Sequence, residues 1–511
     1  MEMAKTLLLG TAASLIALGA AQAADLPVKA KAIEYVKICS LYGPGFYYIP
    51  GTDTCLRLGG YTRGWLEAGS NSTGVNPDFG QGGAVNRFSN SYTWRSRELL
   101  DFDTRTATEY GTVRTFAELV FQWTSGTNSG LGNGSTVYQS LGGVSAPNNA
   151  NPGAVAGGTF GLFFAFIQFA GFTMGMATSQ FSTPWAQYPG NNVALPGASA
   201  FQPVNQFTYT ANFGQGITAS ISAQDQTAQI QAGVWNVSAA SAAGIASGVF
   251  GGSDYAGAIA PDIVGQFRVD QSWGLFQASV AAHDNHAAYY GGTELTGHPD
   301  DKWGWAGQLG LSIKNIPTGT GDSINVSGVY TNGASRYNFN QEMVSNFARY
   351  GNTSLAGAYQ SIGIGGVSDT VFVAGSGQEL TTTYGINGAF NHNWDPHWYS
   401  SIFGALGAVR YNSTAKSYIC GAFVANLALS GGAAGCNPDF DYAVVGTKTA
   451  WTPVKGLTFA AELDYSRLHQ NFASGSTVGL PAQAGIGKPG AVYALKDQDS
   501  FGVEFLVQRN F

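Results

Sequence analysis

Charged side chains recur at alternate positions in three segments of the first quarter of the chain, 56–67, 91–105 and 112–123. Because the side chains of a β-strand alternate between its two faces, residues of one parity share a face. Each of these faces carries guanidinium and carboxylate groups together, so it must face water. In a narrow water-filled passage such groups select ions through the field that they create. The side chains that we expect to line a constriction are Arg57, Arg63, Arg95, Arg97, Arg114, Asp101, Asp103 and Glu118.

The same arginines have an alternative, structural use. Some of them could lie at the mouth of the passage, or form ion pairs with carboxylates of the same faces. Arg105 shares their parity but lies beside a short predicted turn, which makes it the weakest candidate.

Histidines and carboxylates also cluster in His283-Asp-Asn-His286, with Glu294, His298 and Asp300 nearby. Imidazole and carboxylate groups are zinc ligands. The cluster falls in a segment that we predict to be a surface loop, where solvated polar residues are the simpler interpretation. We therefore predict no metal site.

Motifs of catalysis are absent, since the sequence contains no G-x-S-x-G, H-E-x-x-H or phosphate-loop pattern. Motifs do not exclude a Ser/His site on an outer wall. However, His392, His397 and His469 fall near predicted strand ends without a matched nucleophile. We predict that the protein is not an enzyme and uses no cofactor.

Four cysteines form two pairs of equal spacing. Cys39 and Cys55 are sixteen residues apart, as are Cys420 and Cys436, and no CxxC spacing indicates a zinc or redox site. In an exported protein this pattern predicts two local disulfides, each worth about 3 kcal/mol in the chain-entropy model. The alternative is four reduced, buried thiols.

The composition indicates β-structure that faces lipid. Only 11% of the 511 residues are charged, 13% are aromatic and 71 are glycine, whereas soluble domains carry about 25% charged residues. No internal run approaches the roughly 18 apolar residues of a membrane-spanning helix, so strands must cross the membrane. The formal charge of -7 argues against nucleic acid as a partner.

The N-terminus has the parts of a secretory signal peptide. Lys5 supplies the positive region, 7–20 the apolar region, and Ala21-Gln-Ala23 the cleavage site. The apolar region is too short for a membrane anchor. We therefore expect 1–23 to be removed, and 24–55 to form a periplasmic N-terminal segment that begins at Ala24 and contains the Cys39–Cys55 disulfide.

Alternation with period two continues to the C-terminus in sixteen segments. Short connections alternate with long ones such as 124–159 and 332–379. This asymmetry disfavours a soluble sandwich and predicts an all-β fold, a sixteen-stranded antiparallel transmembrane β-barrel over 56–511 with short periplasmic turns and long extracellular loops. The predicted strands are 56–67, 91–105, 112–123, 160–169, 172–178, 204–213, 216–225, 262–270, 273–283, 303–313, 323–331, 380–394, 398–411, 441–451, 457–467 and 500–511.

Aromatic residues agree with this barrel. Tryptophans fall near the predicted strand ends, as the interfacial girdles of membrane barrels require. The last strand alternates and ends on Phe511. It looks like the signal read by the outer-membrane assembly machinery.

Several long motifs distinguish the mature chain: ADLPVK at 24–29, VKICSLYGPGFYYIPGTDTC at 36–55, LRLGGY at 56–61, DTRTATEYG at 103–111 and AFIQFAGFT at 165–173. They resemble those of the alphaproteobacterial general porins. The resemblance spans the mature chain and is densest before residue 215. It implies trimeric, sixteen-stranded, water-filled pores in the outer membrane of a Gram-negative bacterium, through which small hydrophilic solutes and ions diffuse passively.

Partners follow from the composition and from the same resemblance. The lipid-facing composition predicts contact with outer-membrane lipid, and the acidic excess in the loops could bind Ca²⁺ or bridge to lipopolysaccharide through it. Members of the family are linked to the cell wall, so the amine of Ala24 is a candidate for a peptidoglycan link. The competing functions are a solute-specific channel, and a barrel enzyme or adhesin that acts through its surface loops.

In such barrels the loop after the fifth strand folds into the lumen, and by the strand count this loop is 179–203. It contains no Asp, Glu, Lys or Arg, and offers Trp185 and Tyr188 to the constriction instead. General porins usually set acidic groups on this loop against a basic wall. Here the arginine faces would be uncompensated from that side, which predicts a weak anion preference despite the net negative chain.

Overall fold

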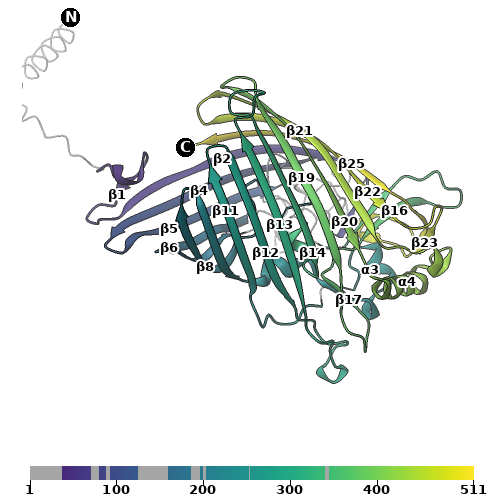
Figure 1. Cartoon of the computed structure of the whole chain (residues 1–511). Helices are drawn as coiled ribbons and strands as arrows, with labels where there is room; N and C mark the ends of the chain where they lie inside the picture. Colours follow the sequence, from purple (N-terminus) through teal and green to yellow (C-terminus); the bar gives the residue numbers. More distant parts are fainter. Residues whose placement is uncertain are drawn as a thin grey trace, which may run out of the picture.

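Antiparallel strands close into a single barrel (Figure 1). The structure is a computed structural model that describes residues 37–70, 80–87, 92–124, 159–185, 196–198, 203–251, 254–339 and 345–511. Among these residues, sixteen strands pair each with the next, and β25 (Gln498–Asn510) pairs with β2 (Cys55–Gly69), so the sheet has no free edge. The fold predicted from the strand count is confirmed. The strands between are β4 (Thr93–Thr108), β5 (Gly111–Thr124), β6 (Thr159–Phe169), β7 (Phe172–Thr178), β8 (Pro203–Gly214), β9 (Ile217–Gln224), β11 (Asp262–Gln271), β12 (Gly274–Asn285), β13 (Lys302–Lys314), β14 (Ser323–Asn332), β19 (Thr382–Asn393), β20 (Trp398–Arg410), β21 (Phe440–Val454) and β22 (Leu457–Gln470).

Side-chain alternation explains why these segments are strands. In β13, Trp303, Trp305 and Leu309 point outward and are exposed, whereas Gln308 and Ser312 point into the barrel and are buried. Lipid solvates the outer apolar side chains, and the closed sheet pairs every backbone group that crosses the bilayer. Within the described part of the chain, no helix is long and apolar enough to cross a membrane.

Strand β6 departs from strict alternation. Its register against β5 shifts between Glu118 and Leu119, so that Phe163 is left without a partner as a β-bulge. As a result Phe160 and Ile167, which have opposite parity, both point outward and are exposed. The inner face of β6 is apolar as well, since Phe164 and Phe166 pack against the ring of Phe116, and this segment therefore reads as apolar on both faces.

Short turns gather at one end of the barrel, and the longest of them, 315–322, is held by Asp322. The carboxylate of Asp322 accepts hydrogen bonds from the hydroxyl of Thr318 (2.7 Å) and the backbone N–H of Asn393 (2.8 Å), and lies 2.6 Å from Nδ1 of His392. Burial alone would raise the pKa of this carboxyl, but these contacts lower it to about 2. The ionised group therefore ties the turn to β19. The other short turns are 109–110, 170–171, 215–216, 272–273, 394–397 and 455–456.

The N-terminal segment lies at this same end, where β1 (Tyr47–Tyr48) pairs with β2. Cys39 is bonded to Cys55, and Cys420 to Cys436, so both disulfides have the predicted pairing. The predicted signal peptide 1–23 and Ala24 lie outside the described residues.

The long connections build further structure at the opposite end (Figure 1). Their apolar side chains pack with inward-facing residues of β20, β21 and β22, among them Phe403, Tyr442 and Leu468. One side of the extracellular end is therefore covered by folded loops. A five-stranded sheet contains β3 (Gly80–Gly82), β15 (Phe347–Gly351), β16 (Gln360–Gly365), β23 (Thr477–Leu480) and β24 (Ala491–Leu495), and a three-stranded sheet contains β10 (Val234–Asn236), β17 (Thr370–Phe372) and β18 (Glu379–Leu380). The helices are α3 (Ala242–Ala246), α4 (Ser413–Leu427) and short 3-10 turns at Ser40–Tyr42, Gln226–Ala232, Val237–Ala239, Glu294–Thr296, Ser335–Tyr337, Gly432–Gly435 and Ala484–Ile486.

Candidate functional site

Strands β2, β4 and β5 carry the predicted charged faces into the barrel. The opposite parity of these strands holds Leu58, Trp94 and Phe121, which are exposed on the outer wall. The charged residues are therefore neighbours on the inner wall, as the alternation predicts. The cross-strand pairs are Arg57 with Asp103, Arg63 with Arg97, Trp65 with Arg95, and Asp101 with Glu118.

One group of charges forms around Asp103. Its carboxylate accepts two hydrogen bonds from Arg105 and two from Arg114, at 2.9–3.2 Å. The Asp103 side chain has no exposed surface, whereas the two arginines are each a little over a quarter exposed. A carboxylate shared by two guanidinium groups cancels part of their charge. The ion-pair alternative therefore holds for Arg105 and Arg114.

The charged faces also reach the N-terminal segment. The guanidinium carbon of Arg57 lies 5.5 Å from the ring centre of Phe46, and that of Arg105 lies 4.9 Å from it. Because Phe46 belongs to the segment at the short-turn end, Arg57 and Arg105 lie toward that mouth of the barrel.

A second group of arginines surrounds Trp65. The guanidinium carbons of Arg95 and Arg97 lie 5.0 Å from the indole ring centre, and that of Arg63 lies 5.4 Å from it. Amide oxygens help to hold two of them, since Arg63 donates to Gln508 (2.6 Å) and Arg97 donates to Gln122 (2.7 and 3.0 Å). An amide oxygen fixes a guanidinium group without cancelling its charge.

The loop after the fifth strand lies against the inner wall in its described parts, 179–185 and 196–198. In the first part, amides from the wall donate to loop carbonyls, and Ser179 donates to Gln224 at 2.8 Å. Trp185 is buried against Gly310 of β13, where a side chain at residue 310 would come within 3.0 Å of the indole. Trp185 thus packs on the wall, and Tyr188 lies outside the described residues. Gln266 donates to the carbonyl of Gln180, and Gln277 donates to those of Phe181 and Ser182, whereas Gln206 donates to the carbonyls of Ala177 and Thr178 at the end of β7.

The second part of the loop crosses β14 and β19. The backbone N–H of Gly197 donates to Asn338, and its carbonyl accepts from the hydroxyl of Ser327 at 3.0 Å. Asn387 donates to the carbonyl of Pro196 at 3.3 Å. These partners are uncharged, so the described loop residues bring no charge to the inner wall.

The wall glutamines that hold the loop were not predicted from the sequence to contact it. Their signal was present, because glutamine recurs at inward parity in five successive strands. Four of the five are fully buried beneath the loop or beside it. Three of them donate to backbone carbonyls, and Gln224 accepts from the hydroxyl of Ser179, whereas the Gln308 amide has no hydrogen-bond partner among the described residues. The residues are Gln206, Gln224, Gln266, Gln277 and Gln308.

The histidine motif has a different place from the one predicted. The surface-loop prediction is wrong for His283, which lies inside β12, as the predicted strand 273–283 implied, and has no exposed surface. Its Nδ1 lies 2.8 Å from Asp262 and its Nε2 lies 2.8 Å from the hydroxyl of Tyr255. Both ring nitrogens thus have hydrogen-bond partners, so the imidazole can be buried inside the barrel and β12 can continue through the motif. Among the described residues, no group of three or more His, Cys, Asp or Glu is arranged to hold a metal ion.

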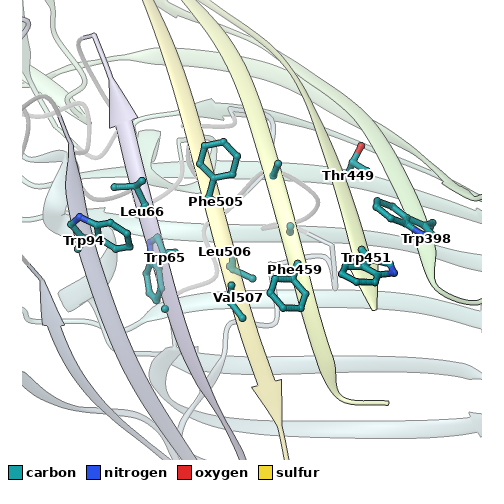
Figure 2. Close-up of a pocket in the computed structure, with 13 residues that line it drawn as sticks. Trp65, Leu66, Trp94, Trp398, Thr449, Trp451, Phe459, Phe505, Leu506 and Val507 are labelled. Carbon is teal, nitrogen blue, oxygen red and sulfur yellow. The ribbon is translucent and has the colours of Figure 1, made fainter. Parts of the chain in front are cut away.

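The outer wall has an apolar groove of about 500 Å³ that crosses β4, β2, β25, β22, β21 and β20. Figure 2 shows aromatic and aliphatic side chains that follow one another across these strands. Gly64 and Ala461 form small positions between larger ones. The labelled outward residues are Trp94, Leu66, Phe505, Val507, Phe459, Trp451 and Trp398.

A closed antiparallel barrel with an aromatic exterior, a charged interior and a loop bound to its inner wall is a β-barrel protein of a Gram-negative outer membrane. The more particular assignment comes from sequence. The family model of the porin subfamily matches residues 25–503, and the chain belongs to this subfamily. The resemblance to general porins is thereby confirmed.

Individual relatives agree with this assignment. Porin Omp2a of Brucella ovis is 36% identical over 222 residues, which are 42% of this chain and 58% of the relative. Porin Omp2b of Brucella suis biovar 1 is 32% identical over 286 residues, which are 55% of this chain and 66% of the relative. The chain therefore spans little more than half the length of the first of these relatives. The solved outer membrane channel DcaP of Acinetobacter baumannii has the same fold, with a TM-score of 0.54 at 14% identity over 91% of this chain and 99% of that chain.

Proposed function

We propose that the protein is a general porin, a water-filled channel through which small hydrophilic solutes and ions diffuse passively, with a weak preference for anions. One observation carries the preference. The described residues of loop 179–198 lie along the arc from β8 to β20 and bond to uncharged partners, whereas the arginines lie on β2, β4 and β5. The loop residues described therefore place no acid against the arginine faces.

The physical basis of the preference is the field of the arginines. In a narrow passage with low-dielectric walls, an ion that has lost part of its hydration shell feels nearby charges strongly. Arg63, Arg95 and Arg97 are the charges we assign to the constriction, because they gather around Trp65 on the inner wall. Arg105 and Arg114 share Asp103, and Arg57 lies near the N-terminal segment. Flux follows the concentration gradient, so this function uses no cofactor and no catalytic group.

Recording from the folded protein in planar bilayers under a KCl gradient tests the proposal. We expect stable channels with a small reversal potential of the sign that reports chloride preference. Absence of conductance would defeat the channel, and a clearly cation-selective current would defeat the assigned role of the arginines. Stepwise block by one sugar or one organic anion would instead indicate a solute-specific channel.

We further propose that the channel assembles as a homotrimer through the outer wall of β25, β2 and β4. Glu98 points outward there and accepts a hydrogen bond from Thr62. A carboxylate on a lipid-facing wall is costly, and a second copy of the chain would shield it. The apolar groove beside it (Figure 2) provides the adjoining contact surface.

A glycine in this wall allows a sharp test of assembly. A Cβ atom added at Gly64 would meet nothing within 4 Å, and the residue lines the apolar groove, so Gly64→Trp is expected to fill the groove and to obstruct the approach of a second barrel. We expect the variant to migrate as a monomer, by light scattering in detergent and on unheated gels. Gly307→Trp, at an outward position of β13 with only ordinary contacts, is the control and should stay trimeric. If the Gly64→Trp variant remained trimeric, the interface would lie on another part of the outer wall.

Three further kinds of partner are proposed. Phe511, whose ring is 63% exposed at the end of the last strand, would be read by the assembly machinery. The outer wall would contact lipid and lipopolysaccharide. The amine of Ala24 would be linked to peptidoglycan, and mass spectrometry of muramidase-released protein with only unmodified N-terminal peptide would refute that link.

A further inference from the structure

Trp65 is the one aromatic residue on the inner wall, among those described, whose ring lies within 5.5 Å of three guanidinium groups. The three arginines come from two strands, with Arg63 on β2 and both Arg95 and Arg97 on β4. In register, Trp65 lies opposite Arg95, and Arg63 lies opposite Arg97. The ring is therefore at the centre of the arginine group.

Three like charges this close repel one another, and the carboxylate of Glu67, 2.7 Å from the indole nitrogen of Trp65, offsets only part of that repulsion. An indole ring attracts cations through the negative potential of its face, and tryptophan does so more strongly than tyrosine or phenylalanine. Guanidinium groups also stack on aromatic planes. The indole thus offsets a further part of the repulsion and draws the three guanidinium groups together.

The ring itself is fixed on its other side. The indole N–H of Trp65 donates to the carboxylate of Glu67 at 2.7 Å, and both side chains are buried. Apolar neighbours on the inner wall, among them Leu506 and Ala460, pack against the ring. A hydrogen bond at one edge and packing against the wall leave the indole a single orientation.

We propose that Trp65 is the positioning residue that sets the anion preference of the channel, by holding Arg63, Arg95 and Arg97 as one cationic cluster in the passage. This inference rests on the proposed channel function. The cluster takes small anions with planar oxygen pairs, such as carboxylates, as well as chloride, because guanidinium forks match that geometry. Trp65 acts through the arginines and needs no contact with the ion.

The test compares three replacements by reversal potential under a KCl gradient and under a potassium acetate gradient. Trp65→Leu removes the ring, and we expect the anion-to-cation permeability ratio to fall toward unity in both salts. Trp65→Phe keeps an aromatic face but loses the N–H bond to Glu67, and we expect most of the preference to remain. Phe116→Leu is the matched control, because Arg114 lies 5.3 Å from that ring but is held by Asp103 as well. It should leave the ratio unchanged.

Each outcome separates a positioning role from a structural one. A structural role of Trp65 would change conductance or folded yield, whereas a positioning role changes the permeability ratio of correctly folded channels. An unchanged ratio in Trp65→Leu overturns the proposal. An equal loss in Trp65→Phe and Trp65→Leu also overturns it, since the hydrogen bond to Glu67 would then be the cause. If the unmodified protein forms no channel, the proposed function fails, whereas channels without anion preference leave the function standing and remove this inference.

Discussion

Asp262→Ala is expected to lower the free energy of unfolding by about 3–5 kcal/mol, the cost of removing one partner from a buried ion pair. Its carboxylate is the acceptor for three groups, with His283 Nδ1 at 2.8 Å, the hydroxyl of Tyr337 at 2.6 Å and the side-chain amide of Gln226 at 3.0 Å. Asp262, His283 and Tyr337 have no exposed surface. The replacement therefore strands buried donors that water does not reach.

The neighbouring pair provides the control. His286 lies 2.7 Å from Asp301, but both side chains are about a quarter to a third exposed. Exposed ion pairs contribute about 0–1 kcal/mol, so Asp301→Ala should be close to the unmodified protein. Urea unfolding in detergent micelles, followed by tryptophan fluorescence, measures both variants. Equal losses in the two variants would mean that the buried network does not stabilise the barrel.

This network also links elements that the sequence does not connect. Asp369, from the connection between β14 and β19, accepts from the hydroxyl of Tyr255 at 2.9 Å, and Tyr255 belongs to the connection after β9. Asp369 also accepts from the backbone N–H of Ser335. Two extracellular loops are thus bound to β11 and β12 through His283 and Asp262, and loss of the pair should loosen these loops first.

The barrel was predictable from sequence because lipid imposes a period of two on every strand. Trp303, Trp305 and Leu309 alternate with polar residues, and they lie on the outer wall as this alternation predicts. The paired cysteines were predictable because each disulfide closes a local loop. The bulge at Phe163 was not, because an extra residue shifts the parity of its strand and leaves only a run of aromatic and aliphatic residues to read.

The sequence predicts which charged residues share the inner face of the barrel, but it does not predict which of them contact one another. Parity places Arg97 and Arg114 on the same wall, and both lie on aromatic rings, yet Arg97 donates to the amide of Gln122 whereas Arg114 is paired with the carboxylate of Asp103. That division depends on cross-strand register, which alternation alone does not set. His283 was misplaced for a related reason: its partners Asp262 and Tyr255 lie in other segments, so its local sequence reads as a polar loop.

The second large effect concerns the contact between the loop and the wall. Gly385→Val is expected to reduce single-channel conductance and to strengthen the anion preference. A side chain at Gly385 would lie 2.6 Å from the amide oxygen of Asn338 and 2.7 Å from the backbone nitrogen of Gly197. The loop therefore has no room for it while it remains bound to β19.

The direction of the effect follows from the position of the loop inside the barrel. A segment that lies on the inner wall can leave it only toward the lumen, so displacement narrows the passage. A narrower passage strips more water from an ion and brings it closer to the arginines, which increases selectivity as conductance falls. Overpacking of this kind also costs about 1–3 kcal/mol of stability.

An outward glycine of the neighbouring strand provides the control. Gly328 of β14 lies opposite Ile386, and a side chain there would come no closer than 3.7 Å to another atom. Gly328→Val should leave both conductance and selectivity unchanged. A Gly385→Val channel with raised conductance and reduced selectivity would indicate that the loop has unfolded. A channel unchanged in both quantities would show that the loop between Ser179 and Ala198 does not form the constriction. If the prediction holds, the loop and the arginines make separable contributions, because the described loop residues bring no charge. The loop sets the width of the passage, and the arginines set the sign of its field.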